Sequence, residues 1–405
     1  MTAQRKAPPI LVLIIATATG PLALNLFVPS MPGLVPIFGT DYHTVQYTLT
    51  LYLAGIAVGQ LLYGPISDRI GRRPTLLAGL AIYTLASLLC AFAGSIEWLI
   101  TGRIFQALGG CAGMVLGRAI VRDVYEREEA APVIAFITMA MAVAPMIGPA
   151  IGGFLDSAFG WYAGFYVVAA MGGAALAYAI PTLHETHHAR AERIDVRSLA
   201  RSYGALLTSR AYLGYTLNTS FSIGCFFAFL SSAPYVTIEI LKIPPHVYGF
   251  FFIIVSLAYI SGNFVATRIS RRLGIDRMIL LGCCFSMGGA VVLTALSTLG
   301  FLSALAIFLP FALVAFGNGM SQPNAIAGAV SVNPLIAGAA SGLMGFMQMV
   351  FGGIATVTVG YFQNDTDFIA LAVTVMVGAC CALASLSLVR NQTPIVPLEQ
   401  EAAAE

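Results

Sequence analysis

Twelve apolar segments, each long enough to cross a bilayer, alternate with short polar stretches along the chain. A membrane-spanning helix needs about 20 mostly apolar residues. Barrel strands are only about 10 residues long, and a backbone in lipid must satisfy its own hydrogen bonds, so the segments predict helices. We expect an all-α integral membrane protein. Its predicted transmembrane helices are 10–31, 45–66, 75–94, 98–121, 131–155, 161–183, 211–233, 247–268, 276–297, 301–324, 336–361 and 367–389.

The composition excludes several classes of protein. Of the 405 residues, 58% are hydrophobic and 9% are charged, with a mean hydropathy of +0.86, whereas soluble domains carry about 25% charged residues. This excludes a secreted disulfide scaffold, a nucleic-acid-binding domain and a disordered chain. The seven cysteines lie in apolar runs without a CxxC pair and fit buried hydrophobic positions. Arg5 and Lys6 precede an apolar run without an A-x-A site, which indicates an uncleaved first span.

Basic residues are distributed unevenly between the two sides of the predicted bundle. If the N-terminus is cytoplasmic, every Lys and Arg in a loop except Lys242 lies on the cytoplasmic side, and Arg103 lies within a span. Cytoplasmic loops of membrane proteins are enriched in Lys and Arg. We therefore expect a multi-pass protein with both termini in the cytoplasm.

A polar interruption at 184–210 separates the first six spans from the last six. Between 195 and 207, Val196, Leu199, Tyr203 and Leu206 recur at helical spacing, with arginines on another face. This pattern predicts an amphipathic helix that lies on the cytoplasmic leaflet. The chain then divides into an N-terminal bundle (1–183), a linker (184–210) and a C-terminal bundle with a short tail (211–405).

The two halves of the chain repeat each other weakly. Arg69–Arg73 after the second span and Arg268–Arg272 after the eighth lie 199 residues apart, and Gly152-Gly153 and Gly352-Gly353 lie 200 apart. A duplicated six-span unit predicts two pseudo-symmetric six-helix bundles around a central cleft. Such an architecture is suited to alternating access, so transport is the leading function.

Six stretches of the sequence resemble known motifs: Gly64–Pro74, Leu99–Gly110, Arg118–Asp123, Ala144–Gly153, Glu185-Thr186 and Phe229–Val236. Together they resemble the motifs of the major facilitator superfamily, and within it the Bcr/CflA group of drug-resistance exporters in the twelve-span drug:proton antiporter branch. The resemblance implies a transporter of the bacterial inner membrane, not an enzyme. It implies efflux of small drug-like compounds, energised by the proton motive force without a bound cofactor. We expect a monomer in the lipid bilayer with a small-molecule substrate and no nucleic-acid partner.

The resemblance also implies that the loop 64–74 latches the two halves in one state and releases them in the other. An acid within this basic turn adds nothing to membrane orientation, which favours gating over a loop that only sets topology. The prolines and glycines of the fifth span indicate a hinge. The predicted gating residues are Gly64, Asp68, Arg69, Gly71, Arg72, Arg73, Arg118, Arg122, Asp123, Pro145, Gly148, Pro149, Gly152 and Gly153.

Arg103 is the one formally charged side chain clearly inside a predicted span. A charge at that depth costs at least about 2.5 kcal/mol, so it needs a partner or a watery cavity. Asn25 lies at a similar depth, and a hydrogen bond from the guanidinium to its side-chain carbonyl is feasible. The alternative is an arginine that snorkels outward to the headgroups. Gln106 lies one turn inward on the same face.

Asn25 departs from the pattern of the Bcr/CflA group, which usually has an aspartate four residues before the proline of the first span. An amide cannot carry a proton, and all 18 acidic residues lie in loops or at span ends. Asp156, Asp41 and Asp123 remain as candidates for proton coupling. With one deep positive charge and no deep carboxylate, we expect neutral or anionic substrates, such as phenicols, to be preferred over lipophilic cations.

Polar and adaptable side chains within several spans are candidates for contact with substrate, although such groups also hold helices together. The predicted substrate-binding residues are Asn25, Tyr52, Arg103, Gln106, Met146, Asn218, Ser222, Phe226, Asn318, Gln322 and Gln348.

A metal site and two other functions are alternatives that the same residues bear on. His184, His187 and His188 do not have the H-E-x-x-H spacing of a zinc site, so we expect no metal. A facilitator or importer of a small organic anion, without proton coupling, would use Arg103 to bind the anion. A polytopic membrane enzyme would need paired acids, a Ser/His pair or a metal cluster at depth, and the spans hold no acid or histidine there.

Overall fold

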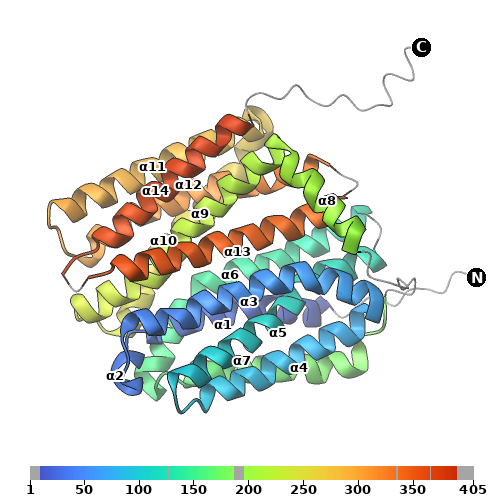
Figure 1. The fold of residues 1–405 in the computed structure, drawn as a ribbon, viewed down its shortest axis with the longest axis horizontal. Coiled ribbons are helices and arrows are strands. Elements are labelled where there is room, and N and C mark those ends of the chain that lie inside the picture. Colours follow the sequence, from blue (N-terminus) through green and yellow to red (C-terminus); the bar gives the residue numbers. More distant parts are fainter. Residues whose placement is uncertain (1–9, 126, 187–195, 334–335, 365, 390–405) are drawn as a thin grey trace, which may run out of the picture.

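The chain folds into a bundle of long helices (Figure 1), and the computed structural model describes residues 10–125, 127–186, 196–333, 336–364 and 366–389. No β-strand occurs among the described residues. Within these described ranges, eleven helices have the length and hydropathy of membrane spans, and α6 contains a further apolar stretch, Val143–Phe159. The predicted all-α membrane fold with twelve spans is therefore confirmed.

The spans of the first half are α1 (Ile10–Phe27), α3 (Tyr42–Ile70), α4 (Arg72–Ala91), α5 (Ile96–Val124), α6 (Arg127–Phe159) and α7 (Ala163–Thr182). Those of the second half are α9 (Arg210–Pro234), α10 (Pro245–Leu273), α11 (Ile275–Thr298), α12 (Ala304–Ser331), α13 (Ala337–Phe362) and α14 (Ile369–Ser385). Short elements are η1 (Val28–Ser30), α2 (Leu34–Phe38), α8 (Val196–Thr208), η2 (Tyr235–Ile240) and η4 (Leu386–Leu388).

Several spans begin earlier than their apolar runs predict, because polar residues outside those runs cap the helices. Asp41 accepts a hydrogen bond from the backbone N–H of Thr44 at the start of α3. Ser95 does the same at the start of α5. Ser303 caps α12, which instead begins at Ala304, within its apolar run. A capped helix begins at the cap rather than at the first apolar residue. Conversely, α1 ends before 31, since the chain continues through Pro29 as the 3-10 turn η1.

Helices α1 and α3–α7 pack mainly on one another, and so do α9–α14, so that the two sets lie side by side (Figure 1). The sets meet chiefly along α3 against α13 and α6 against α10. We call the end of the bundle at which α1 begins and α14 ends the basic end, because it carries Arg72, Arg122 and Arg272. The other is the opposite end.

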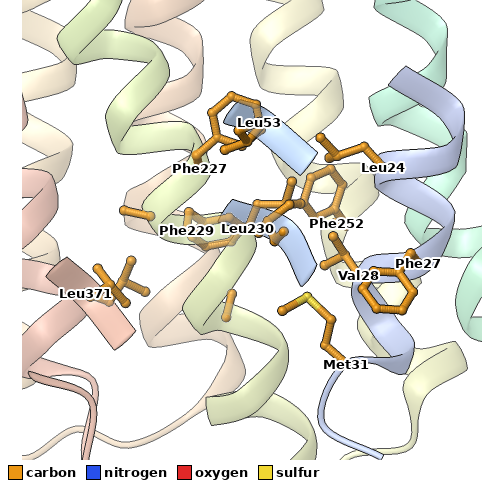
Figure 2. Close-up of a cluster of buried hydrophobic side chains, with 14 of the residues drawn as sticks. Leu24, Phe27, Val28, Met31, Leu53, Phe227, Phe229, Leu230, Phe252 and Leu371 are labelled. Atoms are coloured by element: carbon orange, nitrogen blue, oxygen red, sulfur yellow. The ribbon is translucent and has the colours of Figure 1, made fainter. Parts of the chain in front are cut away.

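A buried apolar cluster joins the two halves toward the opposite end (Figure 2). It contains Phe27, Val28 and Met31 from α1 and the turns that follow it, and Leu230 and Phe252 from α9 and α10. Nearby, the Tyr42 hydroxyl of α3 donates a hydrogen bond to the backbone carbonyl of Ser231 in α9 at 2.7 Å. These contacts close the bundle at the opposite end.

The predicted amphipathic helix is present as α8, but its apolar side differs from the expectation. Leu206 is buried in a cluster with Tyr212 of α9 and Met344 of α13. The prediction that this face lies on the leaflet is therefore wrong for Leu206, since α9 and α13 offer it apolar partners. The side chains of Val196 and Leu199 lie outside the described residues.

Candidate functional site: a buried arginine and its surroundings

Arg103 of α5 is fully buried and lies among aromatic rings. Its guanidinium carbon is 4.0 Å from the centroid of the Tyr52 ring, 4.7 Å from that of Phe27 and 5.9 Å from that of Phe165. Aromatic faces attract a cation, and the attraction grows when the pair is shielded from water. The predicted alternative of a snorkelling arginine is therefore wrong.

The hydrogen bonds of Arg103 use only part of its guanidinium. Nη1 donates to the side-chain carbonyl of Gln106 at 2.6 Å and to the backbone carbonyl of Ala23 at 3.3 Å, whereas Nε and Nη2 have no partner among the described residues. Gln106 in turn donates to Ser87 at 2.7 Å. No salt bridge reaches Arg103 in the part of the chain that the structure describes. The site therefore holds a positive charge with free donors and no carboxylate.

The expected hydrogen bond between Arg103 and Asn25 is not formed. The Asn25 amide nitrogen donates to the carbonyl of Pro21 in its own helix at 2.8 Å, and its side-chain carbonyl oxygen is buried with no partner in the described part of the chain. Tyr52 donates to the carbonyl of Gly20 at 2.8 Å. Side chains thus bind the carbonyls of Gly20 and Pro21. Because proline has no N–H, Pro21 also removes the helical bond to the carbonyl of Thr17, four residues earlier.

A second polar cluster lies at the basic end, around the α3–α4 turn. Arg72 pairs with Asp68 at 2.6 Å and with Asp123 at 3.0 Å, and it also contacts Ser67. The turn itself requires Gly71, whose φ is +115°.

Glu185, which follows α7, completes this cluster. Its carboxylate accepts hydrogen bonds from the backbone N–H groups of Arg72 at 2.9 Å and Arg73 at 3.3 Å, at the start of α4. A carboxylate at a helix N-terminus is favourable because free N–H groups point toward it. Every partner of Arg72 and Arg73 named here lies in the first half or, for Glu185, directly after its last helix α7. Glu185 was not predicted as a site residue, although its stretch contributed to the family resemblance.

The other predicted gating residues at the basic end make fewer contacts. Arg69 and Arg122 are exposed. Arg118 is half-buried, and its Nε donates to the carbonyl of Met114 at 3.3 Å. A side-chain carbon added at Gly64 would meet nothing within 4 Å.

The small residues of α6 form close helix contacts. A side-chain carbon added at Gly148 would lie 2.5 Å from Asn25 Cβ, one at Gly152 would lie 2.1 Å from the Leu26 carbonyl oxygen, and one at Gly153 would lie 2.3 Å from the Pro245 carbonyl oxygen. Pro149 is buried against Gly249 of α10, and Pro145 is half-buried. Within the unbroken helix α6 these residues join α1 and α10, and the hinge remains a prediction.

The three candidate proton carriers have different surroundings. Asp41 is exposed, and the backbone N–H of Thr44 that it caps is the main cause that lowers the pKa of its carboxyl below the ordinary value. Asp123 is paired with Arg72 and also accepts a hydrogen bond from Thr186 at 3.3 Å. Asp156 is half-buried beside the hydroxyl of Ser30.

Most of the predicted polar residues of the second half form hydrogen bonds within that half. Asn218 donates to the carbonyl of Ala382 at 2.8 Å, and its own carbonyl oxygen has no partner. Asn318 donates to the Ser222 carbonyl at 3.3 Å. Gln322 accepts a hydrogen bond from the Tyr259 hydroxyl at 3.1 Å. Tyr259 was not predicted as a substrate-binding residue.

The other predicted substrate-binding residues are Phe226, Gln348 and Met146. Phe226 is half-buried, with its ring 6.4 Å from that of Phe252. Gln348 is half-buried on α13. The side chain of Met146 lies outside the described residues. No group of three or more His, Cys, Asp or Glu side chains in the described part could hold a metal ion, and His187 and His188 lie outside that part.

A twelve-helix bundle in two similar halves, with a buried charge among its helices, is the architecture of a secondary transporter. The sequence profile of the Major Facilitator Superfamily matches residues 13–356. The chain therefore belongs to the Major Facilitator Superfamily, and it is a transporter rather than an enzyme.

The similar proteins agree with this assignment. A bicyclomycin resistance protein homolog from Haemophilus influenzae is 32% identical over 386 residues, which cover 93% of this chain and 94% of that protein. A chloramphenicol resistance protein from Pseudomonas aeruginosa is 30% identical over 368 residues, covering 89% and 87%. The fold matches a mutant of the peptide transporter POT in complex with alafosfalin, with a TM-score of 0.77 at 13% identity and 96% of each chain covered. The resemblance to the Bcr/CflA group is confirmed.

Proposed function

We propose that this transporter exports small drug-like compounds, neutral or anionic, by alternating access and in exchange for protons. The names of two relatives, which refer to resistance to bicyclomycin and to chloramphenicol, support export of antibiotics of this kind. In this proposal the termini and the basic end face the cytoplasm of a bacterial inner membrane. The transporter acts as a monomer, with residues 1–183 and 211–405 as its moving halves around a central cleft.

The observation that carries the proposal is the state of Arg103. Its guanidinium is buried, two of its nitrogens have no hydrogen-bond partner, and no carboxylate pairs with it in the described part. A buried donor without a partner is unfavourable by about 1–3 kcal/mol. A carbonyl, nitro or carboxylate group of a substrate would satisfy these donors, and a cationic substrate would be repelled.

The closed opposite end supports alternating access. Figure 2 shows apolar side chains of both halves meeting there, whereas the basic cluster around Arg72 makes its named contacts within the first half. A transporter that is closed at one end must open there to release substrate. In this proposal the basic end opens and closes in alternation with the opposite end.

The test uses everted membrane vesicles with an acidic lumen. Chloramphenicol, a sulfonamide, an organic anion and a quaternary ammonium dye are added in turn, and release of protons from the lumen is recorded. Proton release with the first three compounds, and little with the dye, is the expected result. If the quaternary ammonium dye is the best substrate, the proposed role of Arg103 is wrong.

A second candidate function is favoured by one observation. Asn25, where a carboxylate is expected from the family resemblance, is an amide that donates to Pro21. A facilitator of small organic anions needs no proton carrier. In the same vesicles it would equilibrate an anion across the membrane without any movement of protons.

A further inference from the structure

A groove of about 530 Å³ opens between three helices of the second half. α13 and α14 both pack against α9 but only slightly against each other, so α9 forms the floor and the other two form the walls (Figure 1). The floor contains Phe221, Gly224 and Cys225, and the walls run along 351–362 of α13 and 369–378 of α14.

The lining of this groove is apolar. Among the described residues that line it, the polar side chains are Thr358, Thr374 and Asn364, and none is charged. Gly224 leaves part of the floor without a side chain, and a carbon added there would approach no atom closer than 3.6 Å. Sites for drug-sized ligands combine apolar walls with a few polar groups that fix the orientation of the ligand. A groove without buried polar groups therefore suits a hydrocarbon chain better than a drug-sized ligand.

The length of the groove matches half of a bilayer. From Phe362 to Phe351, α13 rises by about 16 Å at 1.5 Å per residue. The hydrocarbon core of a bilayer is about 30 Å thick, so one leaflet occupies about 15 Å. At the deep end, the rings of Phe221 and Phe351 pack edge to face with centroids 4.9 Å apart. The groove thus ends where the acyl chains of one leaflet end.

The mouth of the groove lies at the opposite end of the bundle. Tyr361 and Phe362 are 73% and 65% exposed there, with ring centroids 5.1 Å apart. Exposed aromatic side chains are typical of the membrane–water interface. Asn364 follows them and lines the groove, at the level of lipid headgroups. Exposed apolar side chains such as Val373 lie along the walls.

We propose that this groove binds one acyl chain of a membrane phospholipid from the leaflet at the opposite end, with the headgroup beside Asn364. The bound chain fills the space between α13 and α14 and packs against the side of α9 that forms the floor of the groove. On α9, the neighbouring residues Ser222 and Phe226 belong to the predicted substrate path. Bound lipid therefore stabilises the arrangement of α9, α13 and α14, independently of which compound is transported.

Photolabelling tests this assignment. The transporter is reconstituted in phosphatidylethanolamine vesicles with a small amount of a phosphatidylcholine that carries a diazirine on its acyl chain. After illumination, labelled positions are mapped by peptide mass spectrometry. We expect label on α9 at Gly224 and Cys225, even though Cys225 is only 3% exposed. Label at the exposed Leu85 of α4 serves as the internal control.

Two variants fill the groove, and one matched variant does not. Ala355→Phe and Ala370→Phe each place a ring in the groove, because both residues line it. Ala295→Phe adds the same ring on the exposed surface of α11, outside the groove. Label on α9 should fall at least about fivefold in either groove variant and stay unchanged in Ala295→Phe, with Leu85 labelled equally in all.

Three outcomes would overturn the assignment. The first is no label on α9 in the unaltered protein. The second is α9 label that persists in both groove variants while Leu85 is labelled normally. The third is loss of α9 label when chloramphenicol is added, because a drug and not a lipid would then occupy the groove.

Discussion

The guanidinium of Arg103 combines complete burial with the absence of a carboxylate contact in the described part of the chain. Burial of a charge within a membrane protein is unfavourable by several kcal/mol unless partners compensate for it. The Tyr52 and Phe27 rings and the Gln106 carbonyl supply part of the compensation. In the proposed function the remaining donors bind a ligand, so that Arg103 would serve transport rather than folding.

Replacing Arg103 by methionine separates these two roles. Arg103→Met keeps an unbranched side chain and removes an incompletely paired charge, so the melting temperature should stay unchanged or rise. Transport of chloramphenicol should fall at least about tenfold, because a hydrogen bond to a charged group contributes about 1.5–3 kcal/mol. The exposed Arg277→Met is the matched control and should change neither quantity. Full transport by Arg103→Met would show that the arginine is only structural.

Asn25→Asp tests the missing proton carrier. The Asn25 side-chain carbonyl oxygen is buried without a partner, and its nitrogen donates to Pro21. A carboxyl group of the same shape donates to Pro21 when it is protonated and loses that bond when it ionises. We expect more protons released per drug molecule and a new ability to carry cationic dyes, both measured in everted vesicles. An unchanged proton count would argue that coupling does not pass through position 25.

The sequence predicted the residues of this site better than their contacts. The depth of Arg103 within its span and the position of Gln106 one turn away followed from helical spacing. The ring of Phe165 comes from α7, and aromatic residues are common throughout the spans, so no pattern distinguished it. The orientation of Asn25 depended on Pro21 and its carbonyl, which local sequence does not specify.

At the scale of the helices, the density of glycine and proline in α6 has a packing explanation. The contacts of Gly148 and Gly152 with α1, and of Gly153 with α10, require the absence of side chains. The sequence showed which residues were small but not which helices they touch, because contact depends on the tertiary arrangement. Helix ends were also imprecise, since caps such as Asp41 lie outside the apolar runs.

Gly152→Ala measures how much the α1–α6 contact matters. The added methyl group would lie 2.1 Å from the Leu26 carbonyl oxygen, so the two helices must separate. We expect a loss of stability of about 1–3 kcal/mol, measured as a lower melting temperature, together with reduced transport. Gly173→Ala is the matched control, because its added carbon would lie 3.6 Å from Thr84. Equal effects of the two substitutions would contradict the close packing of α6 on α1.

At the scale of the whole molecule, the two halves meet along α3–α13 and α6–α10 and close at the opposite end. The number of spans followed from hydropathy alone, and the repeated motifs indicated the two halves. Which end is closed did not follow, because one sequence serves every state of a transport cycle. The contact between Tyr42 and Ser231 identifies that end.

A crosslink across the opposite end tests whether it must open. The rings of Tyr42 and Tyr235 lie 4.3 Å apart, on α3 and at the end of α9. In Tyr42→Cys/Tyr235→Cys, a short bis-methanethiosulfonate crosslinker, which joins the two thiols through disulfide bonds, should stop chloramphenicol transport, and a reducing agent should restore it. Each single variant, treated in the same way, corrects for the native cysteines. Transport that continues after complete crosslinking would rule out opening at this end.

The most direct test of the whole account is the uptake of radiolabelled chloramphenicol into everted vesicles under an imposed pH gradient. With an acidic lumen, uptake by the unaltered protein should exceed the equilibrium level. Uptake should return to the equilibrium level when an uncoupler collapses the gradient. Arg103→Met should show no uptake above that level. Uptake that stops at equal concentrations on both sides, with or without the gradient, would contradict proton-driven export and identify a facilitator.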